Sequence, residues 1–151
     1  MGANVTVRID GLRELGERLK GLKVDMQKRA AWQACGRGAS IVKREAKKIV
    51  RGNVDAQTSS GSLESAIVAK RVPSGQRRYT AEYWVTARRA KTGRKKAKGK
   101  QAVAPHAGFV EFGTVKMAAE PYLRPALANN VQSIGNAMRD KLAKAIAKFS
   151  K

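Results

Sequence analysis

The side chains that most often carry enzyme chemistry are few and widely separated in this 151-residue sequence. His106 is the only histidine and Cys35 the only cysteine, so the usual four-ligand Cys/His zinc site cannot form. No G-x-S-x-G motif surrounds a candidate nucleophile, and no glycine-rich loop has phosphate-binding spacing. His106 follows Pro105, and we expect a structural rather than a general-base role for it. The sequence therefore predicts a protein that is not an enzyme and uses no cofactor.

The acidic residues give no catalytic pattern either, because all eleven stand singly. Glu111 lies alone between Val110 and Phe112, so a carboxylate pair for hydrolysis or metal binding would need a distant partner. We expect Glu111 to pair with a cation instead, either Arg124 or a residue of a neighbouring subunit.

The charge balance points to a polyanionic partner. The chain has 32 Lys and Arg against 11 Asp and Glu, a formal net charge of +21, and self-repulsion of this size favours binding to nucleic acid, an anionic surface or an acidic protein. The most basic run has eight cations in thirteen residues: Arg88, Arg89, Lys91, Arg94, Lys95, Lys96, Lys98 and Lys100. It has too little apolar surface to offset the entropy of ordering it, which predicts a mobile loop over 88–104.

The basic loop could neutralise several DNA phosphates without reading sequence, since no zinc-finger, RNP or recognition-helix motif is present. A solvated charge run that contacts nothing is the alternative. Tyr83 and Trp84 could stack on bases, but core packing is the favoured interpretation. No apolar run approaches the length that spans a bilayer, and the opening residues have no signal-peptide core. We therefore expect a cytoplasmic compartment and no membrane partner.

Hydrophobic periodicity predicts the elements that surround these residues. Val5–Ile9 alternates as a short strand, and Leu12 to Leu22 has helical spacing closed by Gly21. A long helix is expected from about Asp25 to Val50, with Ala34 and Gly38 on a stripe that permits close approach of a neighbour. Trp32 falls off this stripe and could cover a core edge or mark an interface.

The second half predicts a hairpin and a C-terminal helix. One helical turn near Leu63 should precede strands over 67–72 and 79–87, joined at 73–75. An amphipathic helix of more than twenty residues should begin near Pro125. The predicted fold is α+β: an antiparallel sheet of three to four strands packed by a long central helix and a C-terminal helix, in one domain of residues 1–151.

The segment from Pro105 to Leu127, PHAGFVEFGTVKMAAEPYLRPAL, differs from the rest of the chain. It is apolar and aromatic, contains three prolines, and carries little of the positive charge found elsewhere. Such a segment needs a packed environment, either in the core or on a partner's surface.

Two parts of this segment form a recognisable pattern. Phe109-Val110-Glu111-Phe112-Gly113-Thr114, followed by Lys116 and then by Pro121-Tyr122-Leu123-Arg124-Pro125-Ala126-Leu127, closely resembles the tail-completion (head–tail joining, minor tail component) family of long-tailed bacteriophages. Upstream, GLRELGERLKGL, a long helix ending in VKREAKKIV and a turn of small residues extend the resemblance over nearly the whole chain. The basic insert before Pro105 is longer than the family pattern, and His106-Ala107-Gly108 replaces a more aromatic lead-in.

The resemblance implies a structural virion protein of the phage neck, assembled in the host cytoplasm. Such proteins form rings, commonly six-fold, around the DNA channel between the head adaptor or stopper and the tail terminator. The positions carried over as the oligomer or partner interface are Phe109, Glu111, Phe112, Thr114, Tyr122, Leu123 and Arg124. Gly113 would permit a turn, while Phe112, Tyr122 and Leu123 would anchor packing; alternatively, all of these residues simply hold the fold.

Two functions therefore remain in competition. A phage neck protein accounts for the FVEFGT and PYLRPAL block, whereas a non-specific nucleic-acid-binding protein accounts for the charge but gives no reason for the block.

Overall fold

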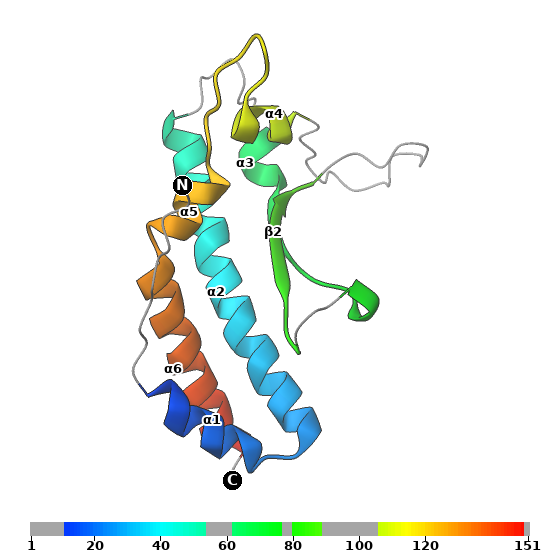
Figure 1. The fold of residues 1–151 in the computed structure, drawn as a ribbon, viewed down its shortest axis with the longest axis vertical. Coiled ribbons are helices and arrows are strands. Elements are labelled where there is room, and N and C mark those ends of the chain that lie inside the picture. Colours follow the sequence, from blue (N-terminus) through cyan, green and yellow to red (C-terminus); the bar gives the residue numbers. More distant parts are fainter. Residues whose placement is uncertain (1–10, 54–61, 77–79, 89–105, 150–151) are drawn as a thin grey trace. The chain divides into compact units, whose positions relative to one another are not determined.

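The computed structural model describes residues 11–53, 62–76, 80–88 and 106–149 (Figure 1). Its elements, in chain order, are α1 Leu12–Lys20, α2 Val24–Asn53, α3 Ser62–Ala66, β1 Ile67–Arg71, the 3₁₀ turn η1 Ser74–Gln76, β2 Tyr83–Ala87, α4 Ala107–Phe112, α5 Leu123–Ala128 and α6 Val131–Phe149. The mixture of helices with a β1–β2 sheet confirms the α+β class.

The described residues fall into two compact units that interleave along the sequence. The first contains the residues up to Ile41, those from Arg71 to Tyr83 and those from Asn130 onward; the second contains those from Val42 to Lys70 and from Trp84 to Asn129. Because α2 and the β1–β2 hairpin contribute residues to both units, the single domain stays a prediction.

Helix packing organises the first unit. α1 lies against α6 (Figure 1), and α2 approaches α6 at Gly38, which is buried. A methyl group at Gly38 would lie 2.7 Å from Met138 Sδ and 3.1 Å from Ile134 Cγ2. The predicted use of Gly38 for close helix approach is confirmed, since no larger side chain fits without movement. α1 is confirmed as a helix closed by Gly21.

The second unit contains the largest fully buried side chains of the described residues. Tyr122, Leu63, Ile67, Val50 and Val110 each expose less than 2% of their surface. They come from α2, α3, β1, α4 and the residue that precedes α5. Segments distant in sequence thus share one apolar core, and the PYLRPAL block supplies its largest member.

The sheet is smaller than predicted. The described residues form two strands rather than three or four, and β2 begins at Tyr83, later than expected. The strand predicted for Val5–Ile9 lies outside the described residues and stays a prediction. The hairpin itself and the helical turn before it are confirmed.

The helices also differ from prediction in two places. FVEF forms the short helix α4, for which no secondary structure was predicted. The C-terminal helix is divided into α5 and α6 at Asn129 and Asn130, because asparagine competes for backbone hydrogen bonds and favours helix ends. The Asn129 N–H caps α5, and the Asn130 carbonyl accepts the first α6 bond from Ile134 N at 2.8 Å. In the described part of the chain, no helix is long and apolar enough to span a membrane.

Candidate interaction site

The turn that follows α4 depends on Gly113. This residue has φ 74° and ψ 178°, a region of backbone space that is nearly restricted to glycine. A methyl group here would lie 2.9 Å from Ala119 N and 3.0 Å from Met117 O. Thr114 and Met117 then pair in an antiparallel bridge, which places Val115 and Lys116 at the tip of a turn. The turn predicted at Gly113 is confirmed, and backbone crowding explains why glycine occupies it.

The carboxylate of Glu111 joins the two halves of the motif. Glu111 is 4% exposed, and its Oε2 accepts hydrogen bonds from Tyr122 N at 2.8 Å and Leu123 N at 2.9 Å. Its Oε1 accepts a third from Arg124 N at 3.2 Å. These donors open α5, where backbone N–H groups have no partner within the helix and where the helix dipole favours negative charge. Glu111 therefore caps α5 from a distance in sequence.

The pairing of Glu111 with Arg124 is confirmed, but it is the weaker part of the arrangement. Arg124 Nε lies 3.9 Å from Glu111 Oε1, and most of the Arg124 side chain is exposed. The three backbone bonds were not predicted. Two sequence signals could have indicated them: Tyr122 offers no side-chain cap to α5, and Glu111 stands between two apolar residues.

Tyr122 belongs to the core of the second unit. Its side chain is 1% exposed, and burial, followed by the nearby Glu111 charge, raises its pKa to about 12. The predicted packing role of Tyr122 is confirmed. Its predicted place on a partner interface stays a prediction, and the burial leaves almost none of its side chain available to a partner. Leu123 is half-buried beside it.

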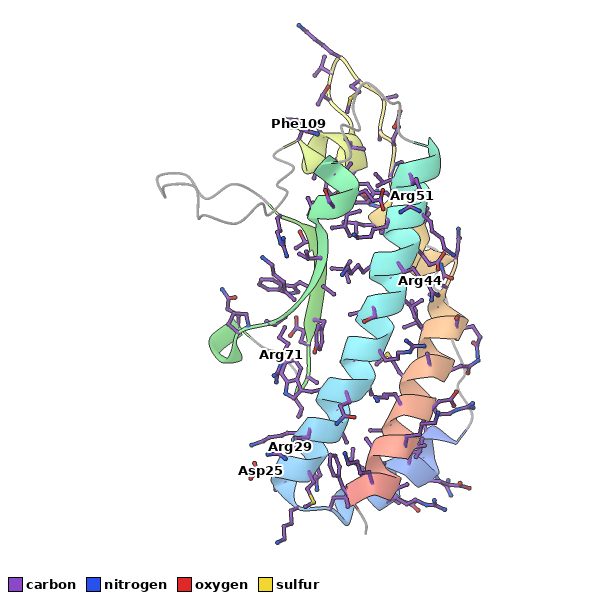
Figure 2. All side chains as sticks on the ribbon, turned by 180° about the vertical axis from the view of Figure 1, so that it is seen from behind. Asp25, Arg29, Arg44, Arg51, Arg71 and Phe109 are labelled. Carbon is purple, nitrogen blue, oxygen red and sulfur yellow. The ribbon has the colours of Figure 1, made fainter. Side chains whose placement is uncertain are left out.

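The aromatic side chains of α4 behave differently. Phe109, labelled in Figure 2, is 58% exposed and Phe112 is 67% exposed. The Arg124 guanidinium carbon lies 4.8 Å from the centroid of the Phe112 ring, a distance typical of a cation–π contact. Phe112 therefore does not anchor the core as predicted. It lies on the surface with Phe109 and the exposed Thr114.

A second aromatic group lies in the first unit. The Arg71 guanidinium carbon is 3.7 Å above the Trp32 ring, and Trp32 meets Tyr83 edge-to-face with centroids 5.5 Å apart. Trp32 and Tyr83 are half-buried, which agrees with packing at a core edge. In the second unit, Trp84 is 46% exposed, so core packing was the wrong expectation for this ring.

Cys35 and His106 lie outside the two halves of the motif in sequence, and each has its own surroundings. Cys35 donates to Ala81 O at 3.4 Å, and partial burial raises the pKa of its thiol. The His106 carbonyl receives the first α4 bonds, while its buried Nε2 has no hydrogen-bond partner within the described residues. Over the same residues, no cluster of three or more His, Cys, Asp or Glu could hold a metal ion.

Most of the predicted basic loop lies outside the described residues. Arg88 alone is described: its N–H donates to Ala66 O at 3.0 Å and so extends the hairpin pairing beyond β2. Arg89, Lys91, Arg94, Lys95, Lys96, Lys98 and Lys100 are not among the described residues.

Comparison with known proteins found no matching family model, no matching curated protein and no matching solved structure.

Proposed function

We propose that this chain is a structural protein of a bacteriophage neck. In this proposal it completes the tail by forming a homo-oligomeric, hexameric ring between the head adaptor or stopper and the tail terminator. The DNA channel passes through the ring, and the basic loop at 88–104 faces the DNA backbone. The chain performs no catalysis and needs no cofactor.

The support comes from the motif that carries the family resemblance. FVEFGT and PYLRPAL are separated in sequence, but Glu111 bonds to the backbone of Tyr122, Leu123 and Arg124. The order and spacing of the two halves thus have a physical reason: one half supplies the carboxylate and the other supplies the helix start. An accidental match of two unrelated short segments would have no such reason to interlock.

The observation that carries the proposal is the exposure of aromatic side chains on this interlocked motif. Phe109 and Phe112 are more than half exposed, and Val115 is fully exposed. Exposed apolar groups held on a fixed frame are typical of surfaces that become buried on assembly. An assembly protein has a use for them, whereas a free-standing monomer gains solubility by losing them.

The alternative function is non-specific nucleic-acid binding, and the net charge of +21 favours it. Its affinity would come from phosphate contacts and would fall steeply with salt, with a log–log slope of about −0.9 per phosphate neutralised. It gives no role to the exposed phenylalanines. Replacing Lys95, Lys96 and Lys98 with Gln should abolish function in step with DNA affinity if this alternative holds.

Deleting the gene from its parent phage or prophage tests the proposal. We expect electron micrographs of the lysates to show DNA-filled heads beside complete but unattached tails. Normal, infectious particles would contradict the neck function and favour the nucleic-acid alternative.

A further inference from the structure

The exposed apolar side chains of α4 and of the turn after it are taken together here as the α4 surface. It consists of Phe109, Phe112 and Val115, with the exposed cations Lys116 on the turn and Arg124 over the Phe112 ring. The three apolar side chains are 58%, 67% and 105% exposed. Phe109 and Phe112 are three residues apart on α4, so they project from the same side of the helix.

The backbone beneath this surface is fixed before any partner arrives. Gly113 holds a turn that other residues cannot adopt without strain, and the Glu120 N–H donates to Val110 O at 2.8 Å. Glu111 ties α4 to α5 through three hydrogen bonds. A surface held in this way loses little conformational entropy on binding.

The charges of the α4 surface are positive. Lys116 is exposed at the tip of the turn, and Arg124 is exposed over the Phe112 ring. The described acids of the same unit are largely engaged within the chain: Glu45 pairs with Arg44 and Lys48, Glu64 with Arg51, and Glu111 is buried. Glu120 is the remaining described acid of this unit and is half-buried.

We infer that the α4 surface docks an acidic protein surface with an apolar centre, belonging to a different protein of the neck. This inference rests on the proposed neck function and names the partner's chemistry. A second copy fits less well at this surface, because the described acids of the same unit are largely engaged within the chain and would leave Lys116 and Arg124 without opposite charges across the contact. Duplex DNA also fits less well, because its phosphate backbone gives Phe109, Phe112 and Val115 no apolar surface to bury against.

In vitro head–tail joining tests the inference with the full chain. Heads and tails from a lysate of the deletion phage are mixed with purified protein, and joined particles are counted by electron microscopy. The variants are Phe112→Ser, Lys116→Gln and Lys116→Glu. Arg37→Glu is the matched control for Lys116→Glu. Arg37 is exposed on α2 in the other unit, and both substitutions replace a positive charge with a negative one. Thermal unfolding verifies that each variant is folded.

Phe112→Ser is expected to lower the joined fraction about tenfold or more, as loss of a central aromatic contact does. Lys116→Glu should lower it further than Lys116→Gln at low salt, and about 0.5 M salt should narrow that gap because surface charges are screened. Arg37→Glu should join like the wild type. Every variant should sediment as the wild type does.

Other results overturn the inference in distinguishable ways. Normal joining by Phe112→Ser would mean that the surface is not a contact, and equal joining by the two Lys116 variants would mean that the partner is not acidic. A changed sedimentation coefficient would make the surface a contact between copies, and DNA affinity lost with Phe112→Ser would make it a nucleic-acid contact. If wild-type protein fails to restore joining, the proposed neck function itself fails.

Discussion

The α2–α6 contact in the first unit and the α4–α5 segment in the second are held together by different interactions. At the first, Gly38 lets two helices approach until Met138 and Ile134 fill the space beside it. At the second, Glu111 hydrogen-bonds to the start of α5, and the neighbour of Gly113 is backbone. One contact is made by apolar side chains and the other largely by hydrogen bonds.

This difference explains which apolar residues are exposed. Where packing holds two helices, their apolar faces must be buried to contribute. Where a buried carboxylate and Tyr122 hold a segment, its remaining aromatic side chains are not needed for the core. Phe109 and Phe112 are therefore available to bind another molecule, and this availability is the basis of the function that we propose.

The largest expected effect comes from removing the carboxylate that distinguishes the second region. Glu111→Ala leaves the N–H groups of residues 122–124 buried or partly buried without their acceptor, and we expect a loss of about 3 kcal/mol in the free energy of unfolding. Glu111→Gln keeps an oxygen acceptor but not the charge and should cost about 1–2 kcal/mol. Urea denaturation measures both. A loss no greater than that of the surface variant Lys116→Ala would contradict the role of this carboxylate.

Gly113→Ala tests whether backbone crowding fixes the turn. The new methyl group would meet Ala119 N at 2.9 Å in a conformation with φ 74°, so we expect a loss of about 2–3 kcal/mol. Because the obstructing atoms belong to the backbone, no side-chain truncation nearby should restore stability. Urea denaturation of Gly113→Ala alone and with Met117→Ala makes the comparison, and full recovery in the double variant would disprove the account.

Gly38→Ala should differ from Gly113→Ala, because truncating a neighbouring side chain should restore part of the lost stability. Its methyl group meets the flexible Met138 side chain, and alanine also favours the helix by about 1 kcal/mol, which offsets part of the overpacking cost. We expect a net loss of about 1 kcal/mol in the free energy of unfolding. Adding Met138→Ala should make the double variant more stable than the sum of the single changes predicts. Strictly additive losses would show that Met138 is not the obstacle.

The raised pKa of Tyr122 gives a prediction at alkaline pH. Its folded pKa of about 12 exceeds the ordinary value of 10.0, so the folded state holds the phenolic proton more tightly than the unfolded state. The resulting stability is complete below pH 10 and is lost as the pH rises toward 12. Tyr122→Phe should flatten this decline in the unfolding midpoint. Identical alkaline profiles for the two proteins would mean that Tyr122 is not buried.

The smallest effect is expected at the exposed ion pair of Arg51 and Glu64. This pair belongs neither to the α2–α6 contact nor to the α4–α5 segment. Arg51, labelled in Figure 2, donates to the carboxylate and lowers the pKa of Glu64 below its ordinary value of 4.5. Because the pKa of Glu64 is lower in the folded state than in the unfolded state, the pair contributes stability above pH 4.5. This contribution is lost as the pH falls through the folded-state pKa. Arg51→Gln should weaken only this acid dependence, with little change in the unfolding midpoint at pH 7.

Periodic apolar spacing predicted the first region from sequence, whereas the second depended on contacts that spacing does not encode. The helices α1, α2 and α6 and the role of Gly38 follow from residues recurring every three or four positions. α4 has only six residues, too short for such a repeat, and the break at Asn129–Asn130 interrupts an otherwise continuous apolar pattern. Local propensity is a weak guide to elements this short.

For the candidate site, the sequence indicated that the two halves of the motif belong together, but not how their residues are arranged; their role at an interface stays a prediction. The motif residues were chosen together, and the pairing of Glu111 with Arg124 was expected. Which members lie inside could not be read from the sequence, because Tyr122 and Phe112 are both aromatic and both belong to the motif. Their difference arises from tertiary structure, which buries Tyr122 in the same unit as the buried Val50 and Leu63 and leaves Phe112 exposed.

The most direct test of the central claim is to locate the chain in mature particles. Virions of the parent phage that carry an epitope-tagged copy would be labelled with gold-conjugated antibody and imaged by electron microscopy, with untagged virions as the control. We predict gold at the junction between head and tail and nowhere else on the particle. Label on the released DNA, or tagged and infectious virions from which the protein is absent, would contradict the account.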